Sequence, residues 1–195
     1  QQFKVYEPNR VWVSDITYWK TKGGHYYISL ITDAFSRKIV GYHVAENMEA
    51  IQSVAALKMA VIPLKIGHTG LIHHSDRGSQ YCSSQYVSAL KKHNIQISMT
   101  ENSDPLENAI AERINGIIKG EYLSDYQINS LTHAKEVLKA VVKLYNEERP
   151  HNSLNNYTPA TIHDNHLEKQ IKRLWKNYYR NEINWEKENV NSFQD

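Results

Sequence analysis

The stretch Val11-Trp12-Val13-Ser14-Asp15-Ile16-Thr17-Tyr18-Trp19 alternates between apolar and polar side chains, as a β-strand with one buried face does. Asp15 interrupts this strand among neighbours that are mostly apolar. A charged group in such surroundings needs a partner or a metal ion. Asp15 is therefore the first candidate site residue.

Two more β-rich segments follow this strand. Residues 26–32 and 38–45 are strand candidates joined through residues 33–37, so three antiparallel strands are expected to open the fold. Asp33 is expected to stabilise that turn and is not placed in the site. The segments predicted after them are a helix over 48–62, a strand over 71–75, a helix over 83–92, a strand over 95–98, and helices over about 105–122 and 132–147. This order predicts an α/β fold with a five-stranded mixed sheet, in which parallel strands add to the three antiparallel ones and helices flank the sheet.

A second carboxylate lies where a predicted strand ends. Asp76 follows the run Leu71-Ile72-His73-His74-Ser75 and precedes Arg77-Gly78. The ends of strands are the usual place for site residues in α/β sheets. A turn-forming aspartate or a salt bridge to Arg77 is the structural alternative, and we favour the functional interpretation.

The third carboxylate lies on the helix predicted to start with Asp104 as N-cap and Pro105 at the first helical position. Glu107 and Glu112 compete for this role, and Glu107 has a capping function three residues after the cap. At about 100° per residue, the helix has an apolar and a polar stripe on opposite sides. The apolar stripe is Leu106, Ile110, Ile114 and Ile117, and the polar stripe is Asn108, Glu112, Asn115 and Lys119. Glu112 is therefore the preferred ligand.

Two other residues of the polar stripe are candidate contacts to nucleic acid. Lys119 lies two turns beyond Glu112 and could meet a phosphate, while Asn115 could reach a base or a sugar. For Lys119, a solvated surface charge is an equally good interpretation.

The three candidate carboxylates come from distant segments, since 35 residues separate Asp76 from Glu112 alone. Such carboxylates form a hard-oxygen site that suits Mg²⁺ or Mn²⁺, and two such ions are a standard solution for phosphodiester cleavage. The chain has 21 acidic residues, so each candidate has to be judged by its own surroundings. On that basis the residues predict an enzyme that cuts nucleic acid.

The composition fits one domain with a short appendage. With 195 residues, of which 41% are hydrophobic, the chain can build a real core. No stretch approaches the roughly 18 consecutive apolar residues of a membrane span, and no charged-then-apolar leader opens the chain, so we expect a cytoplasmic protein. Because the chain starts at Gln1, we also expect that an N-terminal region is missing.

Charge and cysteine content narrow the possible classes. The net charge of +2 and the pI near 8.5 permit a polyanionic partner without requiring one. Cys82 is the single cysteine, which excludes a disulfide framework and a cysteine-rich zinc module. Among the ten histidines, His73 and His74 are adjacent at a strand end and cannot both face one site, so a histidine metal centre is not expected.

Five phrases of the chain, taken in order, match one family. They are Trp12-Val13-Ser14-Asp15-Ile16-Thr17-Tyr18, Asp33-Ala34-Phe35-Ser36-Arg37-Lys38-Ile39-Val40-Gly41, His74-Ser75-Asp76-Arg77-Gly78-Ser79-Gln80-Tyr81, Asn108-Ala109 before Glu112, and Tyr145-Asn146-Glu147-Glu148-Arg149-Pro150-His151-Asn152-Ser153-Leu154 leading to Thr158-Pro159-Ala160. From about Pro8 to Ala160, the chain resembles the catalytic core of OrfB-type bacterial insertion-sequence transposases, relatives of retroviral integrases in the DDE superfamily. Members of that family often have Asp-Asn-Ala where this chain has Glu107-Asn108-Ala109. They usually have an N-terminal helix-turn-helix region, which we expect to be the missing part.

The resemblance implies an RNase H-like fold with Asp15 on the first strand, Asp76 just after the fourth, and Glu112 on a helix beside them. It implies that these three residues are catalytic and that two Mg²⁺ (or Mn²⁺) ions bridge them. The implied activity is cleavage of DNA at insertion-sequence ends and transfer of the 3′-hydroxyl to another strand. The implied partners are transposon-end and target DNA, with further copies of the chain in the complex assembled on DNA, in the prokaryotic cytoplasm at the nucleoid and without a membrane.

Two alternatives stay open. Another RNase H-like nuclease, such as a resolvase, would use the same carboxylates, although hydrolysis does not require the Arg149-Pro150-His151 phrase. A catalytically silent DNA-binding or assembly module is the other alternative, and the presence of all three acids argues against it. We divide the chain into a core at 1–160 and a helical extension at 161–195, in which Ile171, Leu174, Trp175 and Tyr178 have helical spacing.

Overall fold

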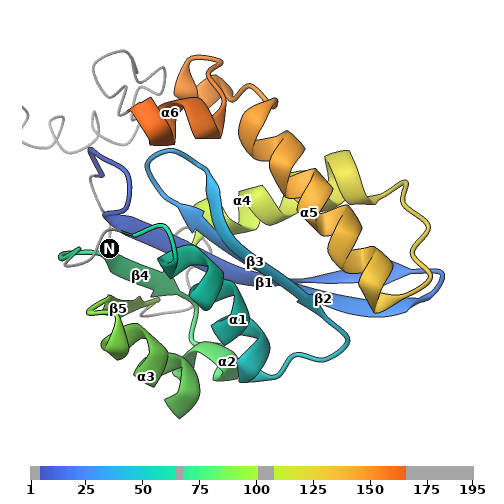
Figure 1. Ribbon diagram of the computed structural model, residues 1–195, viewed down its shortest axis with the longest axis horizontal. Helices are drawn as coiled ribbons and strands as arrows, with labels where there is room; N and C mark the ends of the chain where they lie inside the picture. The colour runs from blue at the N-terminus through green and yellow to red at the C-terminus, as the bar shows by residue number, and fades with distance from the viewer. Residues whose placement is uncertain (1–4, 65–67, 101–107, 166–195) are drawn as a thin grey trace, which may run out of the picture.

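The computed structural model describes residues 5–64, 68–100 and 108–165, and its centre is a five-stranded sheet in the order β3-β2-β1-β4-β5 (Figure 1). The strands are β1 (Val11–Thr21), β2 (Gly24–Asp33), β3 (Ile39–Ala45), β4 (Ile72–Ser75) and β5 (Gln96–Met99). β2 pairs antiparallel with both β1 and β3, whereas β4 pairs parallel with both β1 and β5. The predicted mixed sheet, with three antiparallel strands followed by parallel additions, is confirmed.

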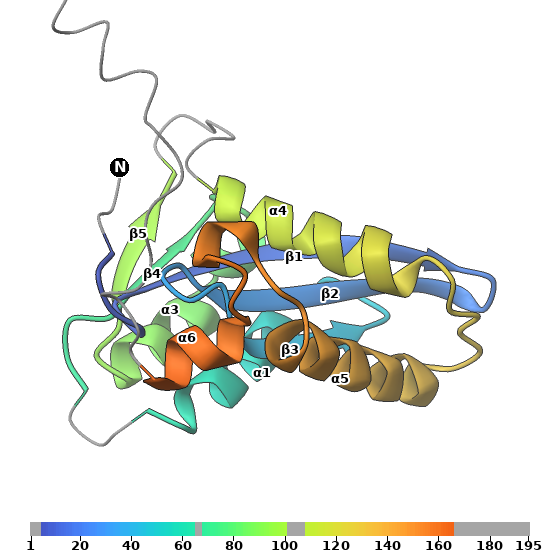
Figure 2. The ribbon, with the colours of Figure 1, turned by 90° about the horizontal axis from the view of Figure 1, so that it is seen from above.

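Helices cover both faces of this sheet. They are α1 (Ala50–Val61), α2 (Ser79–Cys82), α3 (Ser84–Lys92), α4 (Ala109–Ile117), which continues as a π-helix, η2 (Ile118–Leu123), α5 (Leu131–Glu147), the 3₁₀ turn η3 (Asn152–Leu154) and α6 (Pro159–Asn165). Seen from above, α4 lies along β1 and α5 lies beside β3 (Figure 2). None of the helices in the described ranges is long and apolar enough to cross a membrane.

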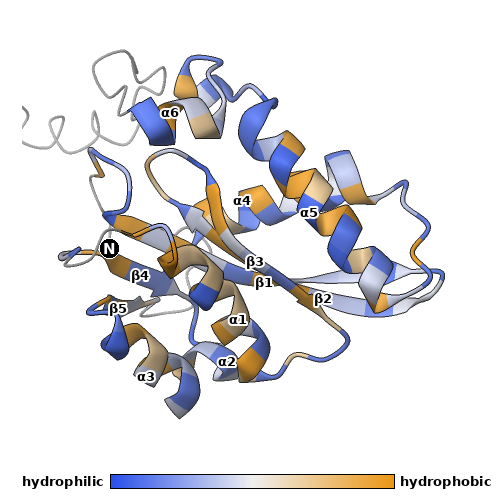
Figure 3. Ribbon diagram, viewed as in Figure 1, coloured by the Kyte–Doolittle hydropathy of each residue, from blue (hydrophilic) through white to orange (hydrophobic). Residues whose placement is uncertain are grey.

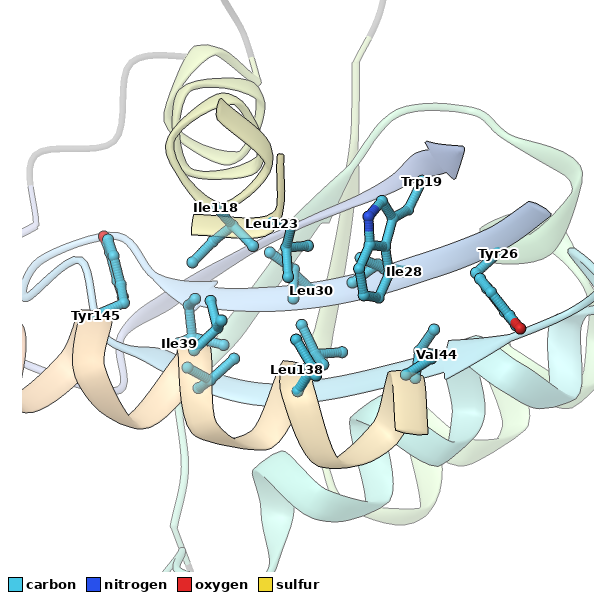
Figure 4. Close-up of a cluster of buried hydrophobic side chains, with 14 of the residues drawn as sticks. Trp19, Tyr26, Ile28, Leu30, Ile39, Val44, Ile118, Leu123, Leu138 and Tyr145 are labelled. Carbon is cyan, nitrogen blue, oxygen red and sulfur yellow. The ribbon is translucent and has the colours of Figure 1, made fainter. Parts of the chain in front are cut away.

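The period of two along the strands separates the core into two layers. On β1, Trp12 and Ile16 pack with α1 and α3, whereas Val13 and Trp19 lie on the face covered by α4 and α5. The layer on the face covered by α4 and α5 is the larger one. Figure 4 shows Trp19, Ile28 and Leu30 of the sheet packed with Leu138 of α5 and Ile118 of η2. In Figure 3, apolar residues accordingly gather where the helices face the sheet. Asp15 alternates with Ser14 and Ile16, so it belongs to the face of α4.

The predicted boundaries agree with these elements to within a few residues, with some differences. The short helix α2, the turn η3 and α6 were not predicted, because they span only three to seven residues and have too little periodicity to detect. The predicted N-cap Asp104 and the capping Glu107 lie outside the described residues, as do Ile171, Leu174, Trp175 and Tyr178.

The predicted role of Asp33 is confirmed. Its carboxylate is fully buried, and Oδ1 accepts hydrogen bonds from the Ser36 amide (2.7 Å) and hydroxyl (2.8 Å), while Oδ2 accepts one from the Asn9 amide (2.7 Å). From α6, His163 Nδ1 lies 2.9 Å from the same Ser36 hydroxyl. Asp33 therefore organises the turn between β2 and β3 and is linked to α6 through Ser36.

Candidate active site

Asp15 is held by two hydrogen bonds on the face of β1 that α4 covers. Its Oδ1 accepts a bond from the Ile16 amide (2.8 Å), and its Oδ2 accepts one from Asn115 Nδ2 of α4 (2.7 Å). Burial raises the pKa of Asp15 above its usual 3.8, and these two hydrogen bonds oppose that shift. The sequence placed a lone charge on an apolar strand, and the fold gives it polar partners from a helix 100 residues away.

Asp76 lies beside Asp15 because their strands are parallel neighbours. Ser14 of β1 is in register with Ser75 of β4, and each candidate aspartate is the next residue along its strand direction. The side chain of Asp76 is exposed, and its Oδ1 accepts a hydrogen bond from the Gly78 amide (2.9 Å). The strand-end position predicted for Asp76 is thus the one that the structure gives it.

Glu112 is exposed on α4, the helix that lies along β1. Its negative charge and that of Asp76 both raise the pKa of Asp15 further, after the larger effect of burial. Like charges act on one another in this way only over short distances, so the fold brings the three predicted carboxylates into one electrostatic neighbourhood. Within the described ranges, however, no group of three or more histidine, cysteine, aspartate or glutamate side chains is already arranged to hold a metal ion.

The polar stripe of the predicted helix needs correction. Asn108 and Asn115 are buried, whereas Glu112 and Lys119 are exposed, so the four residues do not share one solvent-facing side. Asn108 Nδ2 donates to the backbone carbonyl of Ser14 (3.1 Å), and Asn115 donates to Asp15. Asn115, expected to reach a base or a sugar, is therefore engaged with a carboxylate in this structure. Helical periodicity could not predict these two hydrogen bonds, because a buried amide side chain can bond to the sheet as readily as to a ligand.

A buried polar cluster that the sequence reasoning did not anticipate supports the strand pair under the site. His73 Nε2 lies 2.7 Å from the Ser14 hydroxyl and 2.8 Å from the Tyr86 hydroxyl of α3. Burial, and to a lesser extent the neighbouring His74, lowers the pKa of His73 to about 3, so its ring is neutral at pH 7. His73 thus joins β4 to β1 next to Asp15, and His74 instead lies 2.9 Å from the Ser98 hydroxyl of β5. The only sequence signal was two histidines in an apolar strand.

Comparison with known proteins agrees with this architecture. Residues 5–105 match the integrase core domain family, and residues 93–159 match a second family that is also described as an integrase core domain. The chain belongs to the integrase core domain family. The resemblance drawn from the five phrases is thereby confirmed.

Among the relatives of this integrase core are two proteins of bacterial insertion sequences. It is 36% identical over 165 residues to the insertion element IS600 uncharacterized 31 kDa protein of Shigella sonnei, covering 84% of this chain and 60% of that protein. It is also 36% identical over 160 residues to the transposase for insertion sequence element IS904 of Lactococcus lactis, covering 82% of this chain and 63% of that protein. The chain thus spans about three fifths of the length of these relatives.

Solved structures share the fold of this integrase core. The chain of a simian T-cell lymphotropic virus intasome in complex with the PP2A regulatory subunit B56 gamma matches with a TM-score of 0.69 at 20% identity, covering 90% of this chain and 59% of that one. The HTLV-2 integrase catalytic core domain in complex with magnesium matches with a TM-score of 0.63 at 22% identity, covering 80% and 97%. These matches confirm the predicted RNase H-like fold.

Proposed function

We propose that this integrase core is the catalytic part of a bacterial insertion-sequence transposase, which cuts DNA at the element ends and transfers the freed 3′-hydroxyl to another DNA strand. What supports the proposal is the parallel register that sets Asp15 and Asp76 on neighbouring strands, together with the effect of the Glu112 charge on Asp15, within an integrase core. The transposase of IS904, to which the chain is 36% identical, supports this choice of reaction.

Asp15, Asp76 and Glu112 are proposed to hold Mg²⁺ or Mn²⁺, with two ions in the active complex. The donor set fits a hard cation, because all three ligands are carboxylates and because burial and like charge raise the pKa of Asp15, which a cation would reverse. Asp76 and Glu112 are exposed, so their rotamers can adjust toward Asp15. When bound, the ions would activate the attacking water or 3′-hydroxyl and stabilise the leaving 3′-oxygen.

The chain's own residues have separate tasks in this proposal. Asn115 and the Ile16 amide fix both oxygens of Asp15, and the Gly78 amide fixes one oxygen of Asp76. These donors fix the orientation of the Asp15 and Asp76 carboxylates. Lys119, exposed on η2 two turns after Glu112, is proposed to contact a DNA phosphate.

The proposed partners are transposon-end DNA, target DNA and further copies of the chain assembled on DNA. One fold relative was solved as an intasome, which supports assembly of this kind. The proposed location is the bacterial cytoplasm, at the nucleoid, and the relatives from bacterial insertion sequences support a bacterial origin. We propose that residues 1–160 form the core together with α6, and that the rest of the extension at 161–195 is accessory.

The proposal is tested with a supercoiled plasmid and a labelled duplex that has a free 3′-hydroxyl, incubated with the protein and Mn²⁺. We expect nicking of the plasmid and covalent joining of the label to plasmid DNA, with both lost in Asp76→Asn. Lys91→Gln, on the exposed end of α3, is the matched surface control and should behave like the wild type.

The other outcomes separate the alternatives. Nicking that depends on Asp76 without any joining would favour a hydrolytic RNase H-like nuclease. Activity that survives in Asp76→Asn would overturn the site. DNA binding without metal-dependent chemistry, and without Mn²⁺ binding by calorimetry, would indicate a silent binding or assembly module.

A further inference from the structure

The Arg149-Pro150-His151 phrase has no task in the carboxylate site, yet it is built into the fold. Arg149 follows α5 and donates two hydrogen bonds to one carboxylate, from Nε to Glu121 Oε2 (2.7 Å) and from Nη2 to Glu121 Oε1 (2.8 Å). Glu121 lies on η2, so this bidentate pair fastens the chain after α5 to the continuation of α4. Figure 2 shows the orange segment after α5 rising beside α4.

The turn between β2 and β3 also contacts the C-terminal end of α5. The Tyr145 hydroxyl donates to the backbone carbonyl of Arg37 (3.0 Å), and the Tyr145 ring meets the His151 ring edge to face, with centroids 5.4 Å apart. The guanidinium of Arg37 is itself anchored on the Ala34 carbonyl. Tyr145 therefore contacts both the backbone of Arg37 and the ring of His151.

A third arginine, Arg113, adds positive charge from α4, where it is exposed and directly follows Glu112. The hydrogen bond from Arg149 is the main cause that lowers the pKa of Glu121, and the charge of Arg113 adds to it. Burial first, and then the charges of Arg149, Arg37 and Arg113, lower the pKa of His151, whereas the charge of Glu121 raises it. Three guanidinium charges thus act on His151.

His151 itself adds no charge to the group. Only 6% of its surface is exposed, and Nε2 has no hydrogen-bond partner within the described residues. Burial first, and then the three arginines, lower its pKa to about 4, so the ring is neutral at pH 7. With the ring proton on Nε2, this nitrogen is a buried donor without a partner among the described residues, and an anion can accept its hydrogen bond.

We propose that Arg37, Arg113 and Arg149, together with the loop that carries His151, form a binding site for a DNA backbone phosphate. Guanidinium groups suit phosphate because they offer paired N–H donors and a charge that neutral pH does not remove. Glu121 then acts as the resident counterion that holds Arg149 in place and competes with the phosphate for it. This inference rests on the proposed function for the identity of the polyanion as DNA.

The test measures binding of a fluorescent 20-base-pair duplex as a function of salt, in EDTA so that no cleavage occurs. Arg113→Gln should weaken binding about tenfold and reduce the slope of log K against log salt by about one. Lys91→Gln makes the same change of charge on the opposite face of the sheet and should leave that slope almost unchanged. Arg113 is exposed, so its replacement tests the site without loss of folding.

Glu121→Gln distinguishes a phosphate-binding role of Arg149 from a purely structural role of the Arg149–Glu121 pair. Removal of the competing carboxylate should tighten DNA binding several-fold while it lowers the melting temperature, since the pair with Arg149 is lost. A staple alone would lower the melting temperature with binding unchanged or weaker, and that result would overturn the proposal.

The two proposals fail in different ways. If the wild type cuts and joins DNA but Arg113→Gln and Arg37→Gln bind it as Lys91→Gln does, the phosphate site is wrong and the transposase proposal stands. If these variants reduce the salt slope while the wild type shows no metal-dependent chemistry, the phosphate site stands and the proposed reaction falls.

Discussion

At the scale of single residues, Asp15 is where burial, hydrogen bonding and like charge act together. Burial and the charges of Asp76 and Glu112 raise its pKa, whereas Asn115 and the Ile16 amide lower it. A residue kept ionised against its surroundings usually serves function at the expense of stability. Both consequences can be measured.

Asp15→Asn should abolish cleavage and stabilise the fold at neutral pH by about 1 kcal/mol, the usual size of such gains. The amide of Asn115 can turn over to accept from the new side chain, because its Oδ1 has no partner within the described residues. Since the folded-state pKa of Asp15 is raised above 3.8, the penalty is fully present above that folded-state pKa and disappears as the pH falls toward 3.8. Urea unfolding from pH 4 to pH 7 measures this. A gain that is equal at both ends of the range would contradict the assignment to charge.

Asn115→Ala removes the hydrogen bond that lowers the pKa of Asp15, so that pKa should rise. In the proposed enzyme, the acid limb of the pH profile of kcat should therefore move to higher pH, with activity partly recovered under more basic conditions. A uniform loss of kcat with an unmoved limb would indicate that Asn115 acts through packing instead.

At the scale of elements, close contact between α1 and β3 depends on one glycine. A Cβ at Gly41 would lie 2.3 Å from the Ala56 carbonyl oxygen and 2.8 Å from the Ala60 Cβ, both on α1. Real Cβ atoms do not approach so closely, so the helix would have to shift away from the sheet. By contrast, a Cβ at Gly116 of α4 would meet no atom within 4 Å.

Gly41→Ala should therefore lower the free energy of unfolding by about 1–3 kcal/mol, as overpacking of a core does. Gly116→Ala is the matched control and should raise it by up to about 1 kcal/mol, because alanine favours a helix over glycine. Urea denaturation of both variants measures the difference. Equal effects at the two positions would show that α1 is not held against β3 as described.

At the scale of the whole molecule, α6 returns to the start of the fold. Ile162 is fully buried, His163 lies against the turn at Ser36, and Lys38 Nζ lies 2.8 Å from Asp164 Oδ1. The predicted boundary at residue 160 thus falls inside a helix that packs on the core. We therefore expect α6 to unfold together with the core.

Ile162→Ala should lower the midpoint of the single unfolding transition, at a cost of about 2–5 kcal/mol for a buried isoleucine. The transition should stay two-state by both fluorescence and circular dichroism. Asp164→Asn, which affects only an exposed ion pair, should change stability by less than about 1 kcal/mol. A separate early transition in Ile162→Ala, with the main midpoint unmoved, would assign α6 to an independent segment.

The sequence by itself determined the mixed sheet, its strand order along the chain, the three carboxylates and the family. These features are local, because the period of a strand, the end of a strand and a string of phrases can each be read without knowing what lies opposite. Asp33 belongs with them, because its side-chain partner in the turn, Ser36, is only three residues further along the chain.

Only the tertiary structure decided which polar groups face one another. Asn115 turned toward Asp15, His73 joined β4 to β1, and Arg149 paired with Glu121. The same helical periodicity permits an amide to face solvent, a ligand or a carboxylate of the sheet. For Asn115 and His73, the choice depends on contacts between residues 59 to 100 positions apart. In a folded protein it is made by the need of buried polar groups for partners.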